Sequence, residues 1–162
     1  MKTSLDTAHT WFLEGSAQLP SGEFRIRLAE GIKGGARKPV VISEGVVRNF
    51  FPVTVEISSR AVDVIFENAH AVFTFNESYD TNKLALTSED RTKLRRVTTS
   101  SFREHASATT SIFDLVSAPI SEWFLWTEDQ VFQILASGEP TIVEVPGGAD
   151  RNIARNATWA AN

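Results

Sequence analysis

The sequence predicts an α+β fold, in which a curved antiparallel β-sheet or partial barrel of about six to nine strands carries one principal helix near residues 101–117. Two observations lead to this fold class. Short segments of alternating apolar and polar residues recur along the chain between turn-forming residues, a pattern typical of half-buried strands. One stretch, from Ser101 to Val116, instead carries a helix start signal followed by apolar residues at helical spacing.

Three segments give the simplest strand signals. Residues 24–28 alternate cleanly, with three apolar side chains on one face and two arginines on the other. Residues 53–58 alternate in the same way, so we expect a strand whose apolar side chains, Val55 and Ile57 among them, point inward. Residues 140–145 predict a last strand, which a Pro-Gly-Gly sequence closes.

Between Ala61 and Glu77 the alternation changes phase. The apolar positions before the change are Val62, Val64 and Phe66, and those after it are Ala69, Ala71, Phe73 and Phe75, which have the opposite parity. Such a slip exposes one apolar row unless an extra residue is accommodated. We expect that residue near Asn68, either as a β-bulge in one long bent strand or as the tight turn of a hairpin. Phe66 and Phe73 then share the buried side, and His70 faces water.

The predicted helix begins with a capping box. Ser101 and Glu104 have the spacing at which each side chain binds a free backbone N–H of the first helical turn. The apolar residues that follow on one face are Phe102, Ala106, Phe113 and Val116. Ser and Thr residues in the middle weaken the helix, so tertiary packing must hold it, and Pro119 ends it.

Residues 122–126 form an aromatic segment that is apolar on both faces. Trp123 and Trp126 point to opposite faces of a strand, so a second layer must cover one of them, and we consider the helix or a second copy of the chain for that role. Residues 127–136 fit either a helix or the returning half of a hairpin. The hairpin is favoured, because a strand that is apolar on both faces needs paired neighbours for its backbone.

Length and composition indicate one ordinary domain. The 162 residues are 42% hydrophobic and 22% charged, which is typical of a globular chain with a true core. We expect a single β-rich domain at residues 1–148, followed at 149–162 by a tail that is either frayed or a short docking helix.

Charge and cysteine content exclude several classes of function. A net charge of -4 argues against general affinity for nucleic acid. The chain has no cysteine, which excludes disulfides, thiolate nucleophiles and cysteine-bound metals. The longest apolar runs are far shorter than the roughly 18 residues of a membrane span, and no secretion-signal pattern is visible, so we expect no membrane association and a cytoplasmic location.

Glu67 and His70 are the best candidates for catalytic residues. If a bulge lies near Asn68, they share a face, and a carboxylate beside an imidazole can orient a general base. A row of polar residues is also typical of a solvated sheet face, and this interpretation is favoured. The three histidines are isolated and form no metal-binding motif, so we expect neither a metal nor a cofactor.

A basic glycine-rich segment at residues 31–38 is the best candidate for anion binding. Lys33, Arg37 and Lys38 could surround an anion together with backbone N–H groups, but the segment lacks both common phosphate-binding motifs, and a flexible hairpin loop is the favoured interpretation. A second basic cluster consists of Arg91, Lys93, Arg95, Arg96 and Arg103. Most such clusters are simply solvated.

The aromatic residues Trp123, Phe124 and Trp126 are the best candidates for contact with a partner, although aromatic residues also dominate ordinary cores. The function we expect is therefore a non-catalytic cytoplasmic binding module that engages a protein partner or a small apolar ligand through the sheet and this strand. The alternative is a small acid/base enzyme with Glu67 and His70 in a β-rich cavity. A weaker alternative is an anion or nucleic-acid binder.

Overall fold

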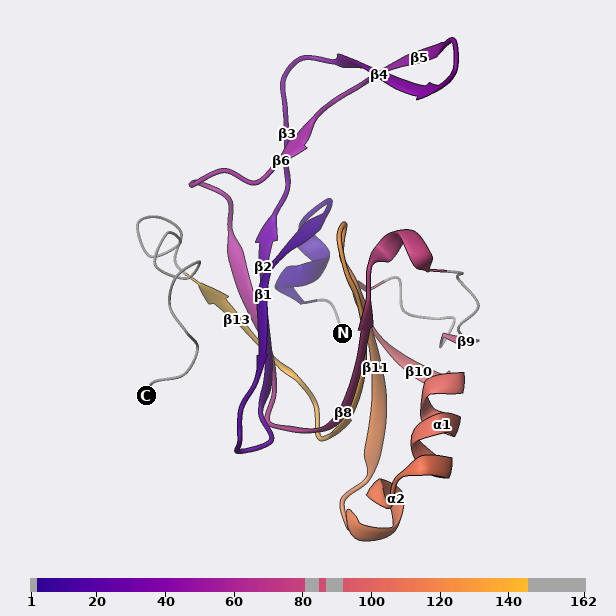
Figure 1. Cartoon of the computed structure of the whole chain (residues 1–162). Helices are drawn as coiled ribbons and strands as arrows, with labels where there is room; N and C mark the ends of the chain where they lie inside the picture. Colours follow the sequence, from indigo (N-terminus) through magenta and orange to yellow (C-terminus); the bar gives the residue numbers. More distant parts are fainter. Residues whose placement is uncertain (1–2, 81–84, 87–91, 146–162) are drawn as a thin grey trace.

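The computed structural model describes residues 3–80, 85–86 and 92–145. Two antiparallel sheets lie face to face, and a narrow arm projects from one end of them (Figure 1). The first sheet has the order β1-β2-β7-β13, formed by Trp11–Gln18, Phe24–Glu30, Ala61–Phe66 and Thr141–Val145. The second has the order β8-β12-β11-β10-β9, formed by Asn68–Phe75, Val131–Ser137, Ile120–Trp126, Leu94–Thr99 and Ala85–Leu86.

These antiparallel sheets, with one main helix, confirm the predicted α+β fold class. The predicted strands at 24–28 and 140–145 correspond to β2 and β13. The chain begins with a short 3-10 helix, η1 (Ser4–Thr7), and a second one, η2 (Glu77–Tyr79), follows β8. No helix in the described ranges is long and apolar enough to cross a membrane. The predicted tail at 149–162 lies outside the described residues.

One main core fills the space between the two sheets. It contains inward side chains from both sheets, among them Phe24, Ile26, Leu28, Val62, Val64, Phe66, Trp123, Leu125, Phe132 and Ile134. Aromatic rings meet across the layers: the ring centroids of Phe24 and Phe132 are 6.2 Å apart, and those of Phe66 and Trp123 are 6.4 Å apart. The period-two pattern of the sequence therefore places one face of β2, β7, β11 and β12 in this core.

The chain passes from the first sheet to the second at Glu67, where the sequence changes phase. β7 pairs with β2 and β13, whereas β8 pairs with β12 in the other sheet, so β7 and β8 do not form a hairpin with each other. Of the two predicted alternatives, the structure has the continuous chain that bends. A register shift also lies inside β8, between Ala69 and Ala71, opposite Leu135 and Ala136.

The expectation that Phe66 and Phe73 share the buried side is wrong. Phe66 lies in the main core, but Phe73 is 47% exposed on the outer face of the second sheet. The register shift at His70 changes the parity of β8 once more, so that Val72 packs against the main core and its neighbour Phe73 turns outward. The outer face of β8 lies on the side of the second sheet that carries the predicted helix, and there the rings of Phe73 and Phe102 stack with centroids 5.8 Å apart.

The predicted helix is present as two pieces, α1 (Ser101–Thr109) and α2 (Ile112–Leu115). The N-cap is Ser100 and not the predicted Ser101: the Arg103 backbone N–H donates to Ser100 Oγ at 3.0 Å. α1 ends because Thr109 and Thr110 donate their hydroxyls to the carbonyls four residues earlier, at 2.7 and 2.6 Å, and the chain after Thr109 leaves the helical conformation.

The predicted hairpin after the aromatic segment is confirmed. β11 and β12 pair antiparallel from Ile120↔Ser137 to Trp126↔Val131. The turn between them is closed by Thr127, whose N–H donates to the Gln130 carbonyl at 2.9 Å and whose hydroxyl accepts from the Gln130 N–H at 3.0 Å. Residues 127–130 thus form a tight turn and do not begin a helix.

Two ion pairs connect strands of the first sheet. Arg27 binds Asp63 in a bidentate manner, with N–O distances of 2.7 and 2.9 Å between nearly buried side chains. Hydrogen bonding to Asp63 raises the pKa of Arg27. Arg60 binds Glu30 at 2.6 and 3.0 Å nearer to solvent, and this contact lowers the pKa of Glu30. Both pairs join neighbouring positions on β2 and the start of β7.

Residues 32–54, which we call the arm, form the projection between β2 and β7 (Figure 1). Its base is the pair β3 (Ile32–Lys33) and β6 (Val53–Thr54), and its tip is the pair β4 (Lys38–Ser43) and β5 (Val46–Phe50). The predicted strand at 53–58 is wrong beyond Thr54, since Val55 and Ile57 are exposed. β6 has only the two residues of β3 to pair with, so the chain leaves extended pairing there.

Candidate functional site

The tip of the arm is a hairpin with a two-residue turn. Ser43 pairs with Val46, and Glu44 and Gly45 make the turn between them. Gly45 has a φ of 76°, in the left-handed region that glycine adopts without steric cost. Two β-branched runs on either side of this turn give the sequence the pattern of a hairpin.

The base of the arm is fixed on the body through Gly31. Its N–H donates to the Thr10 carbonyl at 3.1 Å, next to the start of β1. A Cβ at this position would lie 2.6 Å from side-chain carbons of Thr10 and Val53 and 2.8 Å from the ring of Phe12. Only glycine therefore allows the arm, the body strand and the returning chain to approach this closely.

The predicted anion-binding residues lie on the arm, two of them over one aromatic ring. The Lys33 ammonium lies 4.1 Å from the centroid of the Phe51 ring, and the Arg37 guanidinium carbon lies 5.0 Å from it. Lys38 is exposed at the start of β4. Two of the three cations thus stack on an aromatic ring, a contact that stiffens the middle of the arm.

The two faces of the hairpin tip differ in charge. Paired residues in an antiparallel ladder point to the same side. One face carries the pairs Pro39↔Asn49 and Val41↔Val47 and has no charge; the other carries Lys38↔Phe50 and Val40↔Arg48 and is basic. A binding partner could therefore contact either an apolar face or a basic face of the tip.

The tip exposes an unusual amount of apolar surface. Every residue of β4 and β5 is exposed, and Val41 and Val47 retain 71% and 59% of their accessible surface. The large apolar side chains exposed on these two strands are Val40, Val41, Ile42, Val46, Val47 and Phe50. Large apolar side chains left exposed in this way, on both faces of a hairpin, are typical of interaction sites in soluble proteins.

Glu67 and His70 are close in the sequence, but the structure does not join them as an acid/base pair. No hydrogen bond or ion pair joins them in the part of the chain that the structure describes; Glu67 is exposed, and His70 Nε2 instead lies 2.8 Å from Ser137 Oγ on β12. The register shift in β8 sets the position of His70. Among the described residues, no group of three or more acidic or histidine side chains is arranged to hold a metal ion.

The predicted aromatic contact residues lie mostly inside the protein. Trp123 packs in the main core, and Phe124 is buried in a second, smaller cluster with Val97 and Val131. Trp126 is half-buried against that second cluster. The expectation that the two tryptophans point to opposite faces is thus confirmed, and the side chains of this strand serve packing.

The second basic cluster is largely occupied by contacts within the chain. Lys93 donates to the His9 carbonyl at 2.9 Å, and Arg95 donates to the Thr92 carbonyl at 2.8 Å. Arg96 pairs with Glu139 and lies over Trp123. Arg103 lies over Phe113 at 4.8 Å and donates to the Ile120 carbonyl. Arg91 is outside the described residues.

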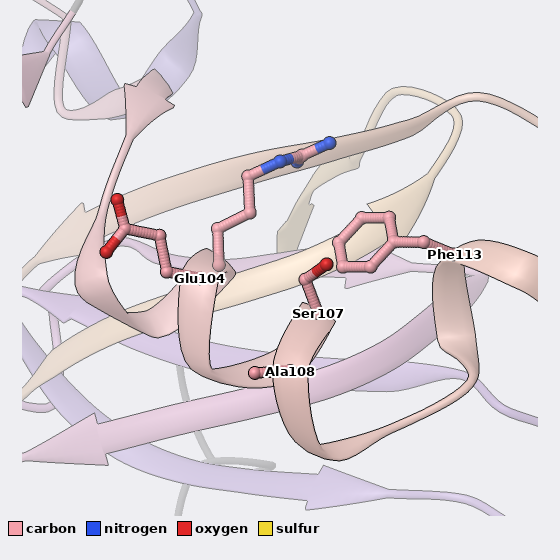
Figure 2. A pocket seen from close by; sticks show the side chains of 5 residues that line it. Glu104, Ser107, Ala108 and Phe113 are labelled. Carbon is pink, nitrogen blue, oxygen red and sulfur yellow. The ribbon is translucent and has the colours of Figure 1, made fainter.

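A hollow beside α1 is lined by Arg103, Glu104, Ser107, Ala108 and Phe113 (Figure 2). It is wide open to solvent, and Figure 2 shows Glu104 and Phe113 on opposite sides of it. Since the guanidinium of Arg103 is held by Phe113 and a carbonyl, the polar groups do not converge on one point, as they would in a catalytic site.

One buried charge was not singled out from the sequence. Glu122 is 1% exposed, and Ser100 Oγ lies 2.7 and 2.8 Å from its two carboxylate oxygens. Burial raises the pKa of Glu122, against the opposing effects of the Ser100 hydrogen bond and the charge of Arg103. The sequence offered one signal for this residue, which is that Glu122 is the only acidic residue in the aromatic segment 122–126. The contact links β11 to the N-cap of α1.

Comparisons with protein-family models, curated proteins and solved structures found no match to this chain.

Proposed function

We propose that this chain is a non-catalytic cytoplasmic module that binds a protein partner, and that the arm makes the contact. The observation that carries the proposal is the hairpin tip, in which six large apolar side chains are exposed on two adjacent strands. The proposal keeps the function expected from the sequence and assigns the contact to the arm, because Trp123 and Phe124 are occupied in the core.

Stability also favours a covered arm. An isolated two-stranded hairpin is marginally stable in water, because two strands bury little apolar surface between them. Complete burial of a Val or Phe side chain stabilises by roughly 1.5–3 kcal/mol. A partner that covers Val41, Val47 and their neighbours would therefore stabilise the hairpin as well as the complex.

The hairpin also offers backbone groups for binding. β4 and β5 pair only with each other in the described part of the chain, so each has an outer edge with backbone donors and acceptors. An extended segment of a partner can add to such an edge as a further strand, while the side chains of the tip provide specificity.

The proposal is tested with a thiol-directed photo-cross-linker, because the chain contains no cysteine that would react elsewhere. Val47→Cys places a benzophenone-maleimide on the tip, and Gln18→Cys places the same group on an exposed residue of β1 as the matched control. Each labelled protein is irradiated in an extract of the cells that make it, with and without excess unlabelled protein.

We expect position 47 to give a discrete cross-linked protein, either another copy of the chain or a different protein, and position 18 to give much less of it. Excess wild-type protein should suppress the product, whereas excess protein with residues 38–50 replaced by a short glycine-serine turn should not. Equal labelling from both positions, or equal competition by both proteins, would refute binding through the arm.

A further inference from the structure

Charge is distributed unevenly between the arm and the rest of the chain. The arm contains four basic residues, Lys33, Arg37, Lys38 and Arg48, and one acidic residue, Glu44, a formal charge of +3. The other residues contain the remaining twelve basic and nineteen acidic side chains, a formal charge of −7. The arm is therefore electrostatically complementary to the body of another molecule of the same chain.

Three phenylalanine rings, one exposed and two half-buried, lie together on the outer face of the second sheet. Phe73, Phe75 and Phe102, which we call the aromatic patch, have ring centroids 5.3 Å apart for Phe73 and Phe75 and 5.8 Å apart for Phe73 and Phe102. Phe73 is exposed although it lies at the centre of this group.

The two surfaces match in character. The tip of the arm has an uncharged apolar face and a basic face that also carries Val40 and Phe50, and the aromatic patch presents the exposed ring of Phe73 on a body whose formal net charge is negative. The arm of the same molecule projects away from α1, on which Phe102 lies (Figure 1). The base of the arm is also held against β1 through Gly31, so the arm does not reach this patch within one chain.

From this complementarity we infer that the partner of the arm is a second copy of this chain, and that the arm of one copy docks on the aromatic patch of another. The inference rests on the proposed function and adds the identity of the partner. Burial of apolar side chains on both sides supplies affinity, and the opposite charges orient the two molecules.

The test is sedimentation velocity of the purified protein over a range of concentrations. We expect the average mass to rise with concentration above that of one chain, and the association to weaken when the salt concentration is raised from about 0.05 M to about 0.5 M. Val41→Thr combined with Val47→Thr keeps β-branched side chains of similar shape and should weaken association about tenfold or more. Val143→Thr, at an exposed valine of the edge strand β13, is the matched control and should leave association unchanged.

The docking surface is tested separately with two measurements. Phe73→Ser should weaken association as the arm variant does, with circular dichroism used to verify that the variant remains folded. The photo-cross-linker on position 47 of the purified protein should label peptides from residues 68–79 or 101–109 of the second copy.

A wild-type protein that remains a single chain at every concentration would overturn the inference, as would association that the Val41/Val47 variant does not weaken, or cross-links to other parts of the body. The proposed function is judged independently, because a cross-link from position 47 to a different protein would support it while refuting the second copy.

Discussion

Gly31→Ala tests the attachment of the arm to the body. The methyl group added by this substitution would lie 2.6 Å from Thr10 Cγ2 and Val53 Cγ1, and 2.8 Å from the Phe12 ring. Contacts under 3.0 Å force something to move, and two of the three neighbours are β-branched side chains with little rotational freedom. Overpacking of this kind destabilises by about 1–3 kcal/mol.

The assay is thermal or urea unfolding, with Gly35→Ala as the control. Gly35 lies in the arm close to Gly31, but a Cβ there would meet no atom within 4 Å. For a domain of this size, about 1 kcal/mol corresponds to about 2–4 °C in Tm, so we expect Gly31→Ala to lower Tm by about 3–10 °C. Gly35→Ala should keep or slightly raise it, because alanine restricts the unfolded chain.

A second readout follows the arm itself. Trypsin can cleave after Arg37 and Arg48, which are both exposed, and displacement of the base by Gly31→Ala should accelerate this cleavage. If Gly31→Ala unfolds at the same temperature as Gly35→Ala and is cleaved at the same rate, the close approach at Gly31 does not hold the arm, and the reasoning is refuted.

Three further substitutions test the interior contacts. Ser100→Ala removes both the helix cap and the partner of a buried carboxylate, so it should lower the free energy of unfolding by about 1–3 kcal/mol in urea titrations. Ser101→Ala, at an exposed position, is the control and should change this free energy by less than about 0.5 kcal/mol. Glu122→Gln should alter the pH dependence: because burial raises the folded-state pKa of Glu122 above its unfolded value, the wild type should lose stability relative to the variant as pH rises from about 4.5 through the folded-state pKa. Asp63→Ala should destabilise by about 2–4 kcal/mol because it removes the bidentate ion pair of the largely buried Arg27 guanidinium. Glu30→Ala should destabilise by less than about 1 kcal/mol because that pair lies nearer to solvent.

Each of these expectations has a contradicting result. Equal losses for Ser100→Ala and Ser101→Ala would place the cap elsewhere. A stability difference between the wild type and Glu122→Gln that is constant from pH 4 to pH 8, or that favours the wild type as pH rises, would mean that burial does not govern the ionisation of this carboxylate. Equal effects of Asp63→Ala and Glu30→Ala would show that burial does not distinguish the two ion pairs.

Local pattern was sufficient to predict β2, whose two faces differ, but not the alternating segment 53–58, which has only β3 to pair with. Residues 24–28 alternate in polarity and became β2, because one of its faces lies in the main core. The hairpin through Thr127 was favoured for a physical reason that the structure confirms: the strand before it is apolar on both faces and obtains paired neighbours on both edges, β10 and β12.

The sequence pattern did not predict features that depend on tertiary contacts. The phase change near Asn68 was visible, but the second shift at His70 depends on the register with β12, and this shift moves Phe73 from the core to the surface. Ser100 was missed as the cap because Ser101 and Glu104 also have capping-box spacing. The choice of Ser100 coincides with its hydrogen bond to Glu122, which lies 22 residues away along the chain.

The arm explains why residue type alone pointed to the wrong surface. Trp and Phe are enriched at interfaces, but they also fill cores, and here Trp123 and Phe124 are needed to cover β11 on both faces. Val and Ile attract less attention, since they are ordinary core residues. In β4 and β5 they have no core to enter, because the neighbouring glycines and the short pair β3 and β6 carry the hairpin away from the sheets.

Exposed valines on a narrow hairpin carry a cost for an isolated molecule. A free strand edge with apolar side chains promotes uncontrolled pairing, and proteins that remain single usually protect such edges with charges, prolines or bulges. The tip of the arm has only part of this protection: Pro39 and a register shift next to Ile42 lie on β4, and Lys38 and Arg48 lie on one face only. The face with Val41 and Val47 is left without charge. A hairpin that limits pairing along its edge but leaves one face apolar is suited to a defined partner surface, in which contacts to the side chains of that face add to pairing along the part of the edge that stays open.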